Sequence, residues 1–167
     1  MKSILFVALI IVSMHVKAQW SGAIFDTLTH NSVSDEVNNQ CIDIDQSGNL
    51  HVVYSRANPV SGWDTFYKKR DASGFWTAED TVSIETDNNP VIAASYVTGK
   101  AFIACSRIVG AGDQIFLCAD SGGSWNCQQI TFDTLENTYP SIDVDMTGFV
   151  HLAWIGLTNT GNHKIKY

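Results

Sequence analysis

Two arginines occupy matching places in the sequence and carry groups that bind anions. Arg56 and Arg107 each directly follow a serine at the end of an apolar stretch. Two guanidinium groups held near each other can clamp an anion through charge-assisted hydrogen bonds. Each arginine can instead pair with a nearby acid or cover apolar surface, and 17 acids against 10 lysines and arginines offer many partners. Arg56 and Arg107 are the candidate ligand-binding residues.

Histidines and aspartates also recur at a fixed spacing that suits metal ligands. His51 and His151 are 100 positions apart. Four aspartates precede them in two copies of one pattern: Asp43, Asp45, Asp143 and Asp145. Such carboxylates are ligands that Ca²⁺ prefers. Repetition of the same residue type at the same place equally fits a structural role, in packing and hydrogen bonding. We favour the structural role and predict no metal or cofactor, with Ca²⁺ as the alternative.

The spacing of two cysteines suits a disulfide across a hairpin. Cys118 and Cys127 flank Gly122 and Gly123. If these glycines form a two-residue turn, the cysteines face each other at a non-hydrogen-bonded site, where antiparallel strands come closest. A disulfide there is geometrically reasonable, and two small buried thiols are the alternative. The cysteine spacings match no metal-site pattern, and the other two cysteines have no evident partner.

The first eighteen residues have the layout of a secretory signal peptide. Lys2 gives a positive start, residues 4–14 are apolar apart from one serine, and residues 16–18 place small side chains at a cleavage site. The apolar run is too short to span a bilayer. We therefore expect the protein to be secreted or displayed at the cell surface, where disulfides are allowed.

The charge of the chain excludes one class of partner. The formal net charge is −7, and removal of the signal peptide would take away two lysines and no acid. An acidic surface repels phosphate backbones, so we expect no nucleic-acid partner. No later stretch is long and apolar enough for a membrane helix, so we expect no membrane span after cleavage.

Comparison of the sequence with itself reveals a repeat of 50 residues. Residues 40–54 and 140–154 share an Ile-Asp-aliphatic-Asp segment, a glycine and a histidine at an offset of 100, and residues 90–104 lie halfway between. Each copy holds short apolar runs separated by glycine-containing turns, and no stretch has helical periodicity. Four antiparallel strands per copy at this period indicate a β-propeller blade, which buries its faces by stacking on neighbours.

The predicted fold class is all-β, an incomplete β-propeller of about two and a half four-stranded antiparallel blades. The predicted divisions are a signal peptide (1–18), an N-terminal strand and linker (19–39), blade 1 (40–89), blade 2 (90–139) and a partial blade 3 (140–167). Residues 20–28 resemble an isolated fourth strand, of the kind that completes the last blade of a closed propeller. We therefore interpret the chain as a piece of a longer protein.

Residues 118–125 resemble the Asp-box of sialidase-like propellers, Ser-x-Asp-x-Gly-x-Thr-Trp. Asp120, Gly122 and Trp125 match the motif, Ser124 stands for its threonine, and Cys118 replaces its first serine. A degraded copy lies at residues 71–76. The resemblance implies a bacterial secreted propeller of this superfamily over about residues 40–167. In that family the box is structural: its aspartate accepts hydrogen bonds from turn amides, and its tryptophan packs between sheets.

The resemblance leaves two classes of function open. Sialidases hold a carboxylate with three arginines, the first in a Phe/Tyr-Arg-Ile-Pro motif, whereas this chain lacks the motif and has three arginines in all. We therefore predict no catalytic residue and expect a non-catalytic binding or adhesion module for a carbohydrate or a surface polymer. The alternative is part of a sialidase-type glycoside hydrolase whose catalytic residues lie in blades outside this sequence. The fold alone decides neither.

Overall fold

The computed structural model describes residues 27–167. The predicted signal peptide lies outside the described residues, as does nearly all of the strand expected at residues 20–28. The chain separates into two units, Met1–His30 and Asn31–Tyr167, and the second unit contains every strand of the described residues. These residues form strands and no helix, so none of them provides a helix able to cross a membrane.

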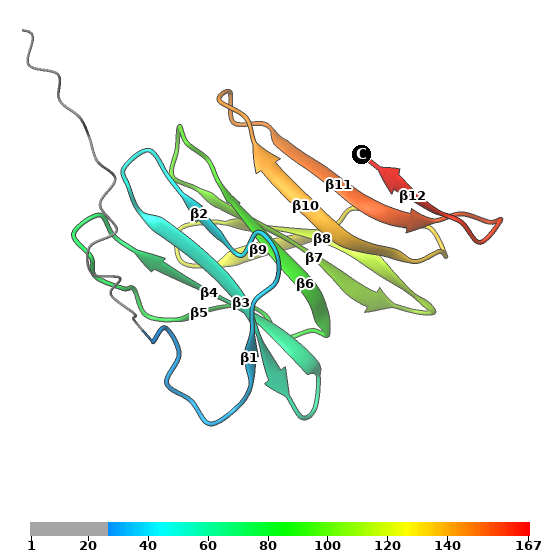
Figure 1. The fold of residues 1–167 in the computed structure, drawn as a ribbon, viewed down its shortest axis with the longest axis horizontal. Coiled ribbons are helices and arrows are strands. Elements are labelled where there is room, and N and C mark those ends of the chain that lie inside the picture. The colour runs from blue at the N-terminus through cyan, green and yellow to red at the C-terminus, as the bar shows by residue number, and fades with distance from the viewer. Residues whose placement is uncertain (1–26) are drawn as a thin grey trace, which may run out of the picture. The chain divides into compact units, whose positions relative to one another are not determined.

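Twelve strands make up the described part of this unit (Figure 1). They are β1 Asp35–Glu36, β2 Ile42–Ile44, β3 Leu50–Asn58, β4 Gly62–Arg70, β5 Asp80–Ser83, β6 Asp87–Ala94, β7 Ala101–Val109, β8 Gly112–Asp120, β9 Trp125–Gln129, β10 Asn137–Val144, β11 Val150–Leu157 and β12 His163–Lys166. The longer strands are rich in β-branched and aromatic residues, which suit a pleated surface that is buried on at least one face.

The strands form three antiparallel sheets, none of which is closed. In the first sheet, β3 pairs with β1, β2 and β4, and β5 follows β4. The middle sheet has the order β6-β7-β8-β9, and the third sheet has the order β10-β11-β12. Each sheet is built from a continuous stretch of chain, and consecutive strands are neighbours except for β1 and β2, which both pair with β3. The predicted all-β class is confirmed.

The repeat in the sequence corresponds to these sheets, with a local displacement of one residue. Ile44 pairs with Leu50 in the first sheet, whereas Ala94 pairs with Ala101 in the middle sheet, so the turn of the middle sheet is one residue longer. The next hairpin loop of the middle sheet is one residue shorter than in the first, which restores the spacing. Equivalent residues of β3 and β7 therefore differ by 51 in number. Equivalent residues of the strands on either side differ by 50.

Each sheet has an interruption in its first strand. The register of β6 and β10 shifts around Asn89 and Tyr139, whose φ angles of 53° and 51° are left-handed values that non-glycine residues rarely adopt. In the first sheet, Gln40 with φ 59° lies between β1 and β2, which both pair with β3. The strands therefore start upstream of Pro90 and Pro140, where the sequence repeat begins. A bulge leaves no mark in a pattern of apolar residues.

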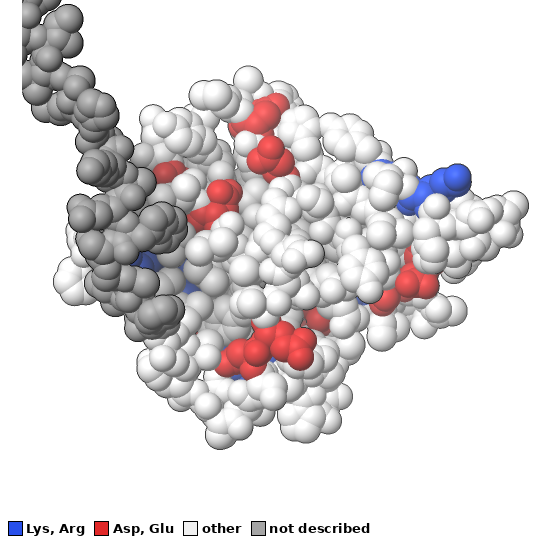
Figure 2. Space-filling view, in the orientation of Figure 1, with Lys and Arg blue, Asp and Glu red and all other residues white. Residues whose placement is uncertain are grey.

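Charged side chains cover little of the surface in the view of Figure 2. Acidic side chains stand in separate small groups on an otherwise uncharged surface, and few basic side chains are in view. Acids exceed lysines and arginines by 17 to 10 in the whole chain. The formal net charge of the whole chain is −7, and the face in view carries more acidic than basic groups.

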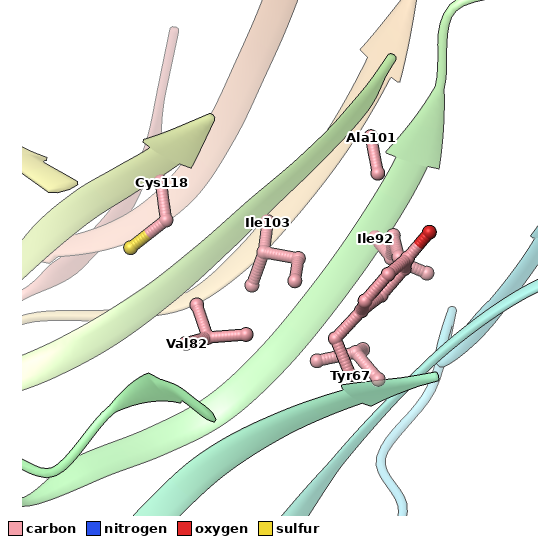
Figure 3. Packing of buried hydrophobic residues seen from close by; sticks show 7 residues of the cluster. Tyr67, Val82, Ile92, Ala101, Ile103 and Cys118 are labelled. Atoms are coloured by element: carbon pink, nitrogen blue, oxygen red, sulfur yellow. The ribbon is translucent and has the colours of Figure 1, made fainter. Parts of the chain in front are cut away.

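Apolar side chains fill the spaces between the sheets in two clusters. The first cluster lies between the first and middle sheets and joins Val53 and Tyr67 to Ile92, Ile103 and Cys118 (Figure 3). The second lies between the middle and third sheets and contains Val91, Ala93, Ala104 and Ile142, with Phe102, Leu117, Val144, Val150 and Leu152 packed around them. The middle sheet is thus covered on both faces. Each fully buried aliphatic side chain stabilises the fold by about 1.5–3 kcal/mol, so the three sheets depend on one another.

Candidate functional site

Arg56 lies near the end of β3 within a set of charge-assisted hydrogen bonds. Its Nε donates to Oδ1 of Asp35 over 2.8 Å, and Nη1 and Nη2 donate to the two carboxylate oxygens of Glu79 over 2.7 and 2.8 Å. The guanidinium carbon is 4.4 Å from the centre of the Phe66 ring. The hydrogen bonds with Glu79 are the main reason that the pKa of Arg56 is raised above its ordinary value.

Arg107 makes the equivalent contacts in the middle sheet. Its Nε donates to Oδ1 of Asp87 over 2.7 Å, and Nη2 donates to Oγ of Ser83 over 2.8 Å. Its guanidinium carbon is 4.2 Å from the centre of the Phe116 ring. As in the first sheet, the acid stands directly opposite the arginine in the strand register. Both arginines therefore hold the first strand of a sheet to the second, and these contacts match the alternative of pairing with nearby acids.

His51 is the centre of a buried Asp–His–Tyr chain. Its Nε2 lies 3.3 Å from Oδ2 of Asp45, and its Nδ1 lies 2.7 Å from the hydroxyl of Tyr67. Asp45 also accepts the backbone N–H groups of Ser47 and Asn49 in the turn before β3. Burial lowers the pKa of His51 below 6.5. Burial acts to raise the pKa of Asp45, but the hydrogen bonds that it accepts outweigh burial and lower it.

The same chain of side chains recurs in the third sheet. Nε2 of His151 lies 3.1 Å from Oδ2 of Asp145, and Nδ1 lies 2.6 Å from the hydroxyl of Tyr167. The corresponding places in the middle sheet are held by Ser95, Phe102 and Leu117. An apolar pair thus replaces the polar chain, which supports the structural interpretation of the two histidines. Within residues 27–167, no three His, Cys, Asp or Glu side chains are placed to hold a metal ion.

The predicted Asp-box residues form the turn between β8 and β9. Oδ1 of Asp120 accepts the N–H of Gly122 over 2.8 Å, and the carbonyl of Ser124 accepts a backbone N–H that closes the turn. The ring of Trp125 lies edge-on to that of Tyr67 with 5.0 Å between the centres, and Trp125 packs against the first cluster. These contacts shape the turn and attach it to the core, which is a structural role.

Two cysteines join the strands on either side of this turn. Cys118 and Cys127 stand directly opposite each other with 3.9 Å between their Cα atoms, and they form a disulfide. This is the register that a two-residue turn at the adjacent glycines predicts. Cys118 belongs to the first cluster and Cys127 packs against it, so the bridge attaches the hairpin to the core. Cys41 and Cys105 are free thiols.

A cavity of about 680 Å³ lies where the first strands of the three sheets begin. Its polar lining comes from all three repeats and consists of Asn38, Asn39, Gln40, Asn89, Tyr139 and Ser141. None of the residues between 27 and 167 that line it is charged. Among the described residues, Gln40, Asn89 and Tyr139 are the non-glycine residues with positive φ, and all three are on this wall. The interrupted first strands therefore converge on one uncharged site.

Several polar groups on this wall are available to a ligand. Within the described part of the chain, the amides of Asn38, Asn39 and Asn89 and the hydroxyl of Tyr139 have no hydrogen-bond partner in the protein. Tyr139 is 62 % exposed, and Asn38 and Asn89 are half-buried. Each amide offers two donors and an acceptor. The wall therefore combines directional neutral hydrogen-bonding groups with an aromatic ring.

Gln40 connects this wall to all three sheets. Its Oε1 accepts a hydrogen bond from Oγ of Ser141 over 3.0 Å and another from the N–H of Ile142 over 3.3 Å, and its Nε2 donates to the Ile142 carbonyl. Its own carbonyl accepts the N–H of Ile92 in β6 over 2.9 Å. The relative positions of the asparagines and the tyrosine therefore depend on Gln40.

The sequence contains a signal for this cavity that the apolar repeat pattern does not reveal. Asn38 and Asn89 precede the repeats that start at Gln40 and Pro90. Asparagine is one of the few residues that tolerates a left-handed backbone, so Asn89 marks a turn of special geometry, whereas in the first repeat the left-handed residue is Gln40 and not Asn38. That the three turns meet at one cavity follows from the packing of the sheets, which the spacing of the repeats alone does not specify.

Comparison with known proteins identifies the fold and no family. No protein-family profile and no curated protein matches the chain. Among solved structures, it is similar to the Hadza microbial sialidase Hz136, with a TM-score of 0.58 and 10 % sequence identity over 77 % of this chain. The matched part spans 34 % of that sialidase chain. At this identity the likeness shows the fold alone: the described sheets have a sialidase-like all-β fold.

Proposed function

We propose that this chain is a repeat module of a secreted β-propeller and that it binds a neutral carbohydrate in the cavity where its repeats begin. Each sheet is then one blade, with β2, β6 and β10 as the innermost strands. The Asp-box resemblance and the likeness to a sialidase fold support the propeller. The observation that carries the binding role is the uncharged wall of unpaired amides beside Tyr139.

The groups on this wall suit a sugar. An amide can accept from one hydroxyl of a sugar and donate to the next, because its oxygen and nitrogen point in neighbouring directions. An exposed tyrosine ring offers an apolar face for the C–H groups of a pyranose and a hydroxyl for hydrogen bonding. Left-handed non-glycine residues cost about 1–3 kcal/mol each and cluster at ligand sites, where the surrounding structure holds them in place. Three such residues at one cavity support binding.

Binding fits this wall better than catalysis. Glycoside hydrolysis commonly requires two carboxyl groups beside the scissile bond, and none of the described residues that line the cavity carries one. Arg56 and Arg107 are paired with Asp35, Glu79 and Asp87, so they do not present a carboxylate clamp. The module is therefore proposed to recognise a glycan without cleaving it.

A sialidase-type glycoside hydrolase remains the second candidate, because the similar solved structure is a sialidase. In that case the arginine cluster and the acid groups come from blades outside this sequence. The two candidates differ in their ligand: the first predicts neutral glycans and no turnover, and the second predicts sialosides. Binding to the recombinant chain separates them, since retention by a sialoside and by no neutral glycan would favour the second candidate. Hydrolysis of a fluorogenic sialoside by this chain alone would refute the non-catalytic proposal.

Export is part of the proposal and is tested separately. The signal-peptide layout of residues 1–18 predicts cleavage after Ala18 and release to the medium or the cell surface. Expression of the full chain in a bacterial host with a secretion pathway, followed by N-terminal sequencing, should give a product that begins at Gln19. An uncleaved product retained in the cytoplasm would refute export.

The binding experiment uses the chain from Gln19 onward and a panel of polysaccharides. Affinity gel electrophoresis should show retardation by at least one neutral polysaccharide and none by polysialic acid. Isothermal titration with oligosaccharides of the retarding polymer then compares variants. Asn89→Ala and Tyr139→Ala should each weaken binding by about tenfold, which corresponds to about 1.4 kcal/mol.

Two substitutions of the same residue types serve as controls. Asn126 lies exposed on β9 and Tyr96 lies exposed in the turn between β6 and β7, and neither lines the cavity. Asn126→Ala and Tyr96→Ala should bind the oligosaccharide as the unchanged chain does. Equal weakening by the cavity variants and the controls would remove the cavity from the proposal, and absence of binding to every neutral polymer would refute it.

A further inference from the structure

The first sheet buries one of its faces beneath the middle sheet. Asp43, His51, Val53 and Tyr67 share this face, because they are register partners or alternate along the strands. Val53 and Tyr67 belong to the cluster that also contains side chains of β6 and β7. The side chain of His51 is 1 % exposed. His51, Val53 and Tyr67 are therefore buried on this face, and Asp43 at its edge is half-buried.

The third sheet presents the same face without a cover among the described residues. At an offset of 100, the corresponding side chains are Asp143, His151, Ala153 and Tyr167. The side chain of His151 is 41 % exposed, and Tyr167 is 81 % exposed. His151 makes the same two hydrogen bonds as His51. The surface is therefore already formed, and it differs from that of the first sheet in having no cover within residues 27–167.

One carboxylate shows what the neighbour supplies. Oδ1 of Asp43 accepts the N–H of Ile44 over 2.8 Å, and its Oδ2 accepts the N–H of Ala94 in β6 over 2.6 Å. Oδ1 of Asp143 accepts the N–H of Val144 over 2.9 Å in the same way. Its Oδ2 has no hydrogen-bond partner within residues 27–167. This oxygen lies where a strand equivalent to β6 would present an N–H.

The rest of the face is apolar. Ile155 and Ile165 are register partners and lie on the same side of the sheet as Ala153 and Tyr167. Ile165 is exposed. Scattered apolar residues are common on surfaces, but a contiguous group of this kind on one sheet face marks a contact with another protein surface. The polar and apolar parts of the face therefore indicate the same kind of partner, a second sheet.

The partner needs a free backbone N–H at the place of Ala94. In the middle sheet the N–H of Ala94 can bond to another sheet, because the side chain of Ala93 offers no acceptor. In the first and third sheets, the carboxylates of Asp43 and Asp143 each accept the N–H of the next residue in their own chain. A second copy of this chain would offer its first sheet, in which the N–H is already taken. It would also bring Lys68 to the place where the middle sheet has a cysteine. The features fit a sheet of the middle type.

We infer that the face of the third sheet carrying Asp143, His151 and Tyr167 docks a further four-stranded sheet of the middle type, which donates a backbone N–H to Asp143. Sheets with the Asp–His–Tyr chain then alternate with sheets that carry the apolar pair, at a period of two repeats. The contact involves the side of the third sheet and not the cavity, so it holds whether or not a carbohydrate binds.

The test extends the full chain after Tyr167 with a second copy of residues 68–136. This copy continues the register, because Tyr167 corresponds to Tyr67, and it supplies copies of β5 to β9. Modification by diethylpyrocarbonate, measured by mass spectrometry, reports the accessibility of His151, with the exposed His30 as internal reference. The extension should slow modification of His151 by about tenfold and leave the protein monomeric.

A matched extension carries Ile92→Asp and Ile103→Asp in the appended copy, which removes its apolar face. It should leave His151 as reactive as in the unextended chain. In the intact extension, Asp143→Ala should restore part of the reactivity. Equal reactivity of His151 with and without the intact extension overturns the inference, and so does an extension that stays sensitive to protease. A dimer of the unextended chain with protected His151 also overturns it, because a second copy is then the partner.

A second measurement does not depend on folding of the extension. In the unextended chain, Asp43→Ala removes the carboxylate that accepts the N–H of Ala94, which is the equivalent contact between the first and middle sheets. Hydrogen exchange of the Ala94 amide should then accelerate by about tenfold or more, because the amide loses its partner at the sheet boundary. Unchanged exchange would show that the carboxylate does not hold the neighbouring sheet, and the inference would lose its basis.

Discussion

Oε1 of Gln40 accepts a hydrogen bond from Oγ of Ser141 over 3.0 Å, although the two residues are 101 positions apart in the sequence. The contact joins the first repeat to the third across the cavity wall. Gln40 also bonds to the backbone of Ile142 on both its N–H and carbonyl sides. A single side chain thus fixes the distance between the parts of the wall that carry the asparagines and the part that carries Tyr139.

Loss of this side chain should weaken both folding and binding. Gln40→Ala removes three hydrogen bonds at a half-open site, where each contributes about 0.5–1.5 kcal/mol. Because Gln40 is exposed, we expect the free energy of unfolding in urea to fall by the low end of this sum, about 1.5–2 kcal/mol, and the carbohydrate affinity to fall by about tenfold. Gln128→Ala, on the exposed side of β9, should change stability by less than about 0.5 kcal/mol. Equal stability and equal affinity of the two variants would show that Gln40 does not hold the cavity wall in place.

The left-handed backbone at Tyr139 should allow the effect of a substitution on stability to be separated from its effect on binding. A non-glycine residue in this region costs about 1–2 kcal/mol, which glycine does not bear. Tyr139→Gly should therefore be more stable than Tyr139→Ala by about 1 kcal/mol, less the entropy that glycine loses on folding. Both variants should bind carbohydrate equally poorly, since both lack the ring. Thermal melting and titration of the same two proteins test this, and a less stable glycine variant would contradict it.

The middle sheet has the apolar residues Phe102 and Leu117 where the first sheet has the hydrogen-bonded residues His51 and Tyr67. His51→Ala should cost about 3 kcal/mol, because it leaves a cavity and removes the partner of the Tyr67 hydroxyl. The triple variant Asp45→Ser, His51→Phe, Tyr67→Leu copies Ser95, Phe102 and Leu117. It should be more stable than His51→Ala in denaturant unfolding. A triple variant that is the less stable of the two would show that the two solutions are not interchangeable.

Stability should fall in acid partly through His51. Burial lowers the pKa of His51 below 6.5 in the folded protein, so the unfolded chain binds the proton more tightly. The contribution of His51 is complete above pH 6.5 and is lost as the pH falls through 6.5 toward the lower folded value. Unfolding in urea at about pH 8 and pH 5 should show a smaller loss for the triple variant than for the unchanged chain. An equal loss in both proteins would assign the acid sensitivity to other groups.

The disulfide should contribute more to stability than either free thiol. Its cysteines are nine positions apart, and closing a loop of this size stabilises by about 2–3 kcal/mol in the chain-entropy description. Replacing Cys118 and Cys127 by alanine should lower the free energy of unfolding by about that amount, and the reductant should then have no further effect. Cys41→Ala, at a half-buried free thiol, is the control. A double variant as stable as the control would contradict the prediction.

Local patterns in the sequence predict the strands and the hairpin at Cys118 and Cys127, because the side-chain period and the turn residues determine them. The same patterns do not locate the residues at which the first strand of each sheet begins. Asp35 lies in a stretch assigned to a linker, yet β1 pairs with β3 and places this acid opposite Arg56. A two-residue strand and a bulge carry too few apolar residues to be recognised.

Partners that are distant in the sequence are the other part that the sequence does not specify. Glu79 and Asp87 reach Arg56 and Arg107 from segments 23 and 20 positions away, and many other acids were available. The cavity is a stronger case, because Asn38, Asn89 and Tyr139 meet only after three sheets have packed on one another. Chemistry that depends on such packing is a property of the fold and not of any local pattern.

The most direct test of a neutral carbohydrate site follows the side-chain amides by NMR. Titration of the labelled chain with an oligosaccharide of the polymer it binds should shift the amide signals of Asn38, Asn39 and Asn89 together, with one dissociation constant, and leave that of Asn126 unchanged. Shifts that spare the three cavity asparagines, or that appear equally at Asn126, would contradict the account.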